Sequence, residues 1–160
     1  MNTTMSCDDV PVNVKGVFIE ETQGGFAPIV LLEDDEEKIM RIYIGSPEAV
    51  SIHMALKSEI PPRPLTHDLF VSLIENIEYE IQKIVISELK GSTYHAKMIL
   101  ENENRSLELD ARPSDCIAIA IRAGIPIFVD NKVFTESTTS IEELGELLSL
   151  IHISEPTRPY

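Results

Sequence analysis

Positive charge is scarce in this sequence: 13 Lys and Arg stand against 27 Asp and Glu, and the formal net charge is −14. Because phosphate binding draws on Lys and Arg, the deficit argues against holding nucleic acid by bulk charge. It does not exclude a nucleic-acid enzyme, since a divalent metal on carboxylates would supply positive charge locally. The run EDDEE at residues 33–37 is typical of a solvated turn.

The chain has no tryptophan and few other aromatic residues, so its core must come from Ile, Leu, Val and Ala. Cys7 and Cys116 are too far apart to suggest a disulfide framework or a metal-binding spacing. No stretch approaches the roughly 18 apolar residues of a membrane span. Residues 1–10 show no basic region with an apolar run. We therefore expect a cytoplasmic protein without a signal peptide or membrane segment.

Common catalytic motifs are missing too: there is no GxGxxG, Walker loop, HExxH or GxSxG, and no internal repeat. The length of 160 residues and the 43% hydrophobic content suit one domain with a real core. Apolar alternation and β-branched residues predict strands. These strands are expected at 12–21, 27–32, 38–44, 80–89, 93–100 and 106–109, with a last hairpin of 126–129 and 132–134 over Asp130-Asn131.

Helix signals separate some of the strands. Ser46 and Thr66 are suitable N-caps, and the second helix repeats Leu69, Phe70, Leu73, Ile74 and Ile77 at helical spacing. A third helix is expected from Pro113 to Ala123, ending at Gly124, and it is apolar from Cys116 to Ile121. The sequence predicts an α+β fold, with a mixed or antiparallel sheet of hairpins packed against three to four helices, one of them central and buried.

Polar residues gather at the ends of these elements, where a scaffold positions functional side chains. Carboxylates, arginines and a histidine together suit phosphodiester hydrolysis. The predicted catalytic residues are Glu48, His67, Asp68, Asp110 and Asp115. Asp110, Asp115 and Glu48 would hold a divalent metal (Mg²⁺ or Mn²⁺), and His67 would move a proton. Arg63, Arg112 and Arg122 would bind phosphate. Each residue also has a plainer interpretation, as a helix cap, a helix-dipole partner or an ion pair.

Three segments resemble the bifunctional nuclease (BFN) domain family: IGSPEAVSIHMAL, PPRPLTHDLFVSLI and LDARPSDCIAIAIRAGIPIFV. Their order and spacing agree with the family over about residues 12 to 135. The resemblance implies a compact α+β domain, commonly a homodimer, that cleaves both DNA and RNA. Ser46, where the family has Glu, and Cys116, usually Ala, depart from the pattern.

Two further expectations concern the C-terminal part of the chain. Many relatives carry a UVR motif, which would imply an excision-repair partner; residues 139–147 are either its start or a terminal helix of the same domain. Residues 148–160, LSLIHISEPTRPY, resemble a translated sequencing adaptor and are expected to be non-native. We thus predict a disordered segment at 1–11, a domain at 12–138, a helix at 139–147 and a foreign tail. The alternative to a low-specificity nuclease is a non-catalytic binding or regulatory dimerisation domain.

Overall fold

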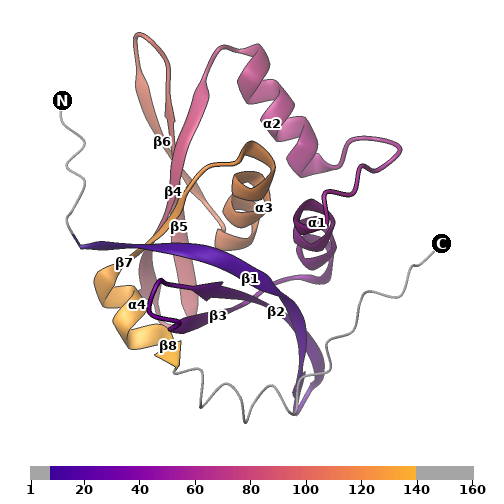
Figure 1. Ribbon diagram of the computed structural model, residues 1–160, viewed down its shortest axis with the longest axis vertical. Helices are drawn as coiled ribbons and strands as arrows, with labels where there is room; N and C mark the ends of the chain where they lie inside the picture. Colours follow the sequence, from indigo (N-terminus) through magenta and orange to yellow (C-terminus); the bar gives the residue numbers. More distant parts are fainter. Residues whose placement is uncertain (1–7, 140–160) are drawn as a thin grey trace.

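The computed structural model describes residues 8–139, which fold into a sheet with helices gathered mainly on one face (Figure 1). The elements are β1 (Asp9–Thr22), β2 (Gly25–Glu33), β3 (Ile39–Tyr43), α1 (Ser46–Leu56), α2 (Thr66–Asn76), β4 (Glu80–Lys90), β5 (Thr93–Glu101), β6 (Ser106–Ala111), α3 (Pro113–Ala123), β7 (Ile127–Asp130), α4 (Asn131–Ser137) and β8 (Thr138–Thr139).

The described strands form one mixed sheet in the order β6-β5-β4-β7-β1-β2-β3-β8. Neighbouring strands are antiparallel except β4 and β7, which run parallel. Parallel neighbours need a crossover connection, and the chain between β4 and β7 includes α3. The long strand β1 joins the two halves of the sheet, because residues 9–12 pair with β7 and residues 13–22 pair with β2.

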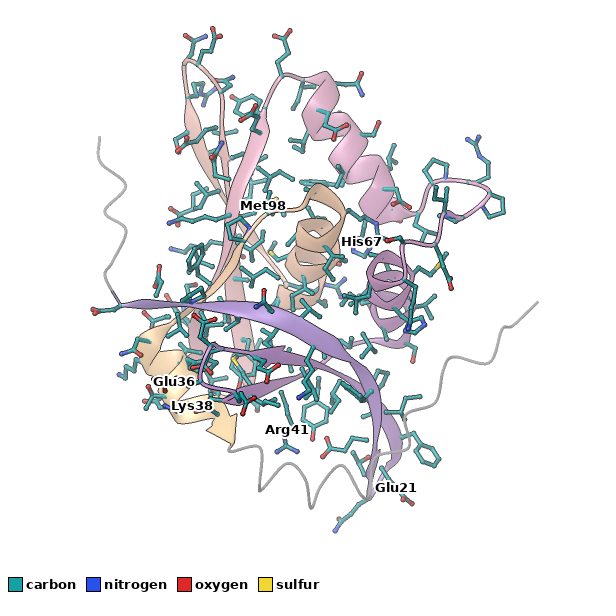
Figure 2. The ribbon with its side chains drawn as sticks, in the orientation of Figure 1. Glu21, Glu36, Lys38, Arg41, His67 and Met98 are labelled. Carbon is teal, nitrogen blue, oxygen red and sulfur yellow. The ribbon has the colours of Figure 1, made fainter. Side chains whose placement is uncertain are left out.

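Helix α3 lies at the centre of the molecule. It contacts α1 and α2 on one side and β4 and β5 on the other (Figure 1), and its residues Cys116 to Ala120 are all buried. The core around it is aliphatic: Ile84, Met98 and Ile117 are fully buried, and Figure 2 labels Met98 beside α3. Gly124, with a φ of 67°, ends the helix in the left-handed region that favours glycine. The predictions of an α+β fold and of one central buried helix are confirmed.

The predicted last hairpin is wrong. Residues 132–134 belong to helix α4, because the Asp130 side chain accepts hydrogen bonds from the backbone N–H groups of Lys132 and Val133 and caps that helix. The strand before it, β7, pairs with β1 and β4 instead. Asp130-Asn131 is therefore the start of a helix and not the turn of a hairpin.

The other helix starts differ from prediction by one residue. Gly45, not Ser46, is the N-cap of α1, and Leu65, not Thr66, is the N-cap of α2. At α2 the Asp68 carboxylate accepts the backbone N–H of Leu65 at 2.8 Å, so this carboxylate does the capping. At α2 a side chain reaching back from the first turn thus replaces the expected hydroxyl cap, whereas the N-cap of α1 makes no side-chain capping hydrogen bond.

The ends of the described region bear on the predicted boundaries. Strand β1 begins at Asp9, ahead of the boundary predicted at residue 12. Thr139 is in β8; the rest of the predicted helix at 139–147 and the tail at 148–160 lie outside the described residues. In the described part of the chain, no helix is long and apolar enough to cross a membrane.

Candidate functional site

Seven polar side chains from the first three helices form one connected network, called the polar cluster below. Each helix contributes an acidic residue from its first turn, where the positive end of the helix dipole stabilises a carboxylate. Figure 2 shows His67 at the start of α2, close to α1 and α3. The members of the polar cluster are Glu48, Ser51, His67, Asp68, Arg112, Asp115 and Arg122.

Arg112, the N-cap of α3, joins α3 to α1. Its Nε donates to Asp115 Oδ2 at 2.7 Å, and its Nη2 donates to Asp115 Oδ1 at 3.1 Å and to Glu48 Oε1 at 2.9 Å. These two carboxylates raise the pKa of the guanidinium above its usual value. The Arg112 side chain is 66% exposed, so the network opens to solvent at this end.

The Glu48 carboxylate folds back over Gly45 at the start of α1. A Cβ on Gly45 would collide with Glu48 Oε2, so a larger residue there would displace the Glu48 carboxylate from its present position. Gly45 has an ordinary φ of −78°, so backbone strain does not favour glycine there.

His67 occupies the middle of the network. Its Nδ1 lies 2.6 Å from Ser51 Oγ, and its Nε2 lies 2.9 Å from Asp115 Oδ1. Ser51 is only 4% exposed and was not predicted as a site residue. The one sequence signal for it is its position three residues after Glu48, which places both side chains on one side of α1.

Arg122 anchors the buried end of the network. Its Nε donates to Asp68 Oδ1 at 2.7 Å, and its Nη2 donates to Ser51 Oγ at 2.9 Å and to the Ser51 carbonyl at 3.2 Å. Its Nη1 donates to the carbonyl of Ala118 at 2.9 Å. The side chain is 10% exposed. These contacts favour a structural role over the predicted phosphate binding, because every guanidinium nitrogen already has a protein partner.

The contacts of Ser51 favour one arrangement of the proton on the His67 ring. Arginine can only donate, so Ser51 Oγ accepts from Arg122. The hydroxyl proton of Ser51 has His67 Nδ1 as its acceptor when the imidazole proton is on Nε2, facing Asp115. In this tautomer the buried hydroxyl and both ring nitrogens have a hydrogen-bond partner.

This assignment predicts the nitrogen shifts of the imidazole. At pH 7 a long-range ¹H–¹⁵N spectrum should show the Nε2–H tautomer for His67. In Ser51→Ala the nitrogen shifts should move towards the fast-averaged pattern of a free ring, whereas Ser87→Ala, a change at a serine remote from the cluster, should leave them unchanged. An Nδ1–H tautomer in the wild-type protein would contradict the assignment of the His67 proton to Nε2.

Two carboxylates of the polar cluster hold lowered pKa values. Burial raises the pKa of Asp115, but its hydrogen bonds from Arg112 and His67 outweigh burial. Burial likewise raises the pKa of Asp68, and the hydrogen bonds from Arg122 and the Leu65 backbone outweigh it. Both groups are therefore ionised at neutral pH.

These shifts predict a loss of stability in acid. An acid with a lowered folded pKa stabilises the fold above its unfolded value of 3.8 and loses that contribution as the pH falls through the folded pKa. The melting temperature should therefore fall steeply below pH 3.8. Asp115→Asn should start lower and fall less over the same range, measured by circular dichroism. An identical pH profile in both proteins would contradict the assignment.

Two predicted site residues do not join the polar cluster. The Asp110 side chain is exposed on β6 and acts electrostatically on Lys97. Its carboxylate makes no hydrogen bond or ion pair with the described residues. Arg63 is exposed in the loop at 57–65. The sequence therefore indicated six of the seven members, missed Ser51, and added Asp110 and Arg63.

The polar cluster as it stands does not fit a metal ion. Among residues 8–139 no group of three or more His, Cys, Asp or Glu is arranged to hold one. Of the predicted ligands, Asp110 lies apart, and Glu48 and Asp115 are bound to Arg112. A divalent ion would need to take the place of the Arg112 guanidinium.

Comparison with known proteins identifies the family. The model of the bifunctional nuclease domain matches residues 29–142. The chain belongs to the bifunctional nuclease domain family, as its three motifs indicated.

The relatives differ in how much is known of them. An uncharacterized protein of Mycobacterium tuberculosis (strain ATCC 25618 / H37Rv) is 36% identical over 127 residues, which are 79% of this chain and 74% of that protein. "Bifunctional nuclease 1" of Oryza sativa subsp. indica is 26% identical over 124 residues, 76% of this chain and 38% of that protein. "Bifunctional nuclease 1" of Arabidopsis thaliana is 24% identical over 136 residues, 78% of this chain and 42% of that protein.

Proposed function

We propose that this protein is a low-specificity nuclease that hydrolyses phosphodiester bonds in DNA and RNA, with the exposed end of the polar cluster as its active site. Family membership and the names of the plant relatives support a nuclease-type function. One observation supports the location: Arg112 is 66% exposed, and its Nη1 has no hydrogen-bond partner among residues 8–139.

Arg112 would bind the scissile phosphate through Nη1. Its charge stabilises the additional negative charge of the transition state, in which water attacks phosphorus as the bond to the leaving oxygen breaks. Glu48 and Asp115 are the nearest proton acceptors for that water. His67, whose Nε2 lies 2.9 Å from Asp115 Oδ1, would orient that carboxylate and relay the water's proton towards the leaving oxygen.

The proposal is tested with the purified 160-residue chain, single-stranded DNA and single-stranded RNA, each with Mg²⁺, with Mn²⁺ and with EDTA. Cleavage of both nucleic acids is expected. Activity that survives EDTA would mean that Arg112 supplies the positive charge alone. Activity restored only by Mg²⁺ or Mn²⁺ would support an ion that displaces Arg112 from Glu48 and Asp115. No cleavage in any arm by a folded protein would refute a nuclease.

A non-catalytic binding or regulatory domain is the second candidate, and one observation favours it. Each carboxylate of the polar cluster has an arginine partner: Glu48 and Asp115 pair with Arg112, and Asp68 pairs with Arg122. A purely structural network predicts no turnover with any metal, and it predicts that Asp115→Asn lowers the melting temperature alone.

The cellular setting is part of the proposal. We propose a cytoplasmic homodimer, as the resemblance to the family implied, and sedimentation of the purified protein tests the dimer. An excision-repair partner would require a UVR motif beyond residue 139, outside the described residues.

A further inference from the structure

Helix α2 presents an apolar face to solvent. Its predicted apolar repeat suggested one buried face, but only Ile74 of that repeat is buried. Leu69 is 63% exposed, Leu73 is 52% exposed and Ile77 is 51% exposed. Their spacing of four residues aligns them along one side of the helix. These three residues are called the α2 stripe below.

An acidic hollow lies at the C-terminal end of the α2 stripe. It has a volume of about 540 Å³, and its lining residues come from the ends of α2 and β5, the start of β4 and the adjoining turns. These segments lie in the upper part of Figure 1. Five of its lining residues are glutamates and none is Lys or Arg. The lining residues are Glu75, Glu78, Tyr79, Glu80, Gln82, Glu101, Asn102 and Glu103.

The hollow adjoins the C-terminal end of the stripe, because Glu78, which lines the hollow, directly follows Ile77 in the chain. We propose that together they bind a basic amphipathic helix of another protein. The apolar side chains of that helix would cover Leu69, Leu73 and Ile77, and its Lys and Arg side chains would enter the hollow. An exposed apolar helix face is suited to a helical partner, and the five carboxylates select a basic one.

The charge distribution disfavours the other occupants. A nucleic acid would place its phosphates against the glutamates. A second copy of this chain would bring its own net charge of −14 to the surface beside the hollow, whereas a basic helix would bring the complementary charge. Leu69 directly follows Asp68 in α2, but the stripe is made of apolar side chains and supplies no group to the polar cluster. The proposal therefore does not depend on nuclease activity.

The test uses the 160-residue chain and a fluorescent synthetic helix with one leucine face and lysines elsewhere, followed by fluorescence anisotropy. A peptide with glutamate in place of lysine is the matched control. The wild-type protein should bind the lysine peptide and not the glutamate peptide. Leu73→Ser should weaken binding about tenfold, the loss typical of a truncated interface anchor. Phe26→Ser removes another exposed apolar side chain, on β2, and should change nothing.

Charge is tested separately. The double variant with Glu75→Gln and Glu78→Gln should bind the lysine peptide more weakly and with less dependence on salt. Unchanged binding by Leu73→Ser, or equal binding of the two peptides, would overturn the proposal. A wild-type dimer that Leu73→Glu converts to monomer would also overturn it, because the stripe would then belong to a second copy.

Discussion

Replacing Arg122 with leucine is expected to lower the melting temperature by about 10 °C. The change leaves Asp68 without its ion pair and the buried Ser51 hydroxyl without its donor. Breaking a buried ion pair costs about 3–5 kcal/mol, and we expect about 3 kcal/mol because Asp68 is partly exposed. At about 3 °C per kcal/mol for a chain of this size, thermal unfolding followed by circular dichroism would measure the shift directly.

Two matched variants isolate the cause. Arg112→Leu removes another arginine of the polar cluster, but its side chain is mostly exposed, so the expected cost is at most about 1 kcal/mol. Arg122→Leu combined with Asp68→Asn removes both charges, keeps an oxygen that can accept the Leu65 N–H, and should recover part of the lost stability. If Arg122→Leu and Arg112→Leu destabilise equally, Arg122 is not the anchor of the cluster.

Replacing Arg112 with alanine is expected to lower the rate of DNA and RNA cleavage by about 100-fold or more. Within the proposed function, Arg112 is the charged group that meets the phosphate, and most of its effect should arise in the transition state. The turnover number should therefore fall more than the apparent substrate affinity. Gel-based initial rates at several substrate concentrations would separate the two quantities.

The controls for Arg112 also distinguish the motif-based assignment of the catalytic residues from the assignment based on the observed geometry. Arg105→Ala removes an exposed arginine from the turn before β6 and should leave the cleavage rate close to wild type. Asp115→Asn should reduce it strongly, since Asp115 holds Arg112 through two hydrogen bonds. Asp110→Asn, predicted from the motif to be equally damaging, should have little effect because Asp110 lies outside the polar cluster. A large loss in Asp110→Asn would favour the motif-based assignment over the observed geometry.

Sequence reasoning worked best where one local rule decided the outcome. The segment from Cys116 to Ile121 has no polar side chain, so a helix there had to be buried, and its charged neighbours Arg112 and Asp115 had to lie at its open end. Asp110 was grouped with them by closeness in sequence. The chain changes from strand β6 to helix α3 between these residues, and this change of direction separates side chains that are neighbours in the motif.

Other features depended on tertiary structure that no local pattern specifies. A lone Ser51 among apolar residues has the pattern of a core position, and only the packing of α1 against α3 brings Arg122 to it. The apolar repeat of α2 predicted which side chains share a face, but it could not show that no described element covers Leu69 and Leu73. Asp130 suits a turn and a helix cap equally well, and the two hydrogen bonds to its carboxylate decide between them.

The order of the polar cluster along the chain has a consequence for synthesis. Glu48, Ser51, His67 and Asp68 are made first. Arg112 follows Glu48 by 64 residues, and Arg122 lies further along the chain. A nascent chain that ends before residue 112 therefore carries neither arginine of the cluster. The proposed active site can form only when translation has passed residue 122, so the mRNA and ribosome nearby would meet no competent phosphate-binding arginine until the domain is almost complete.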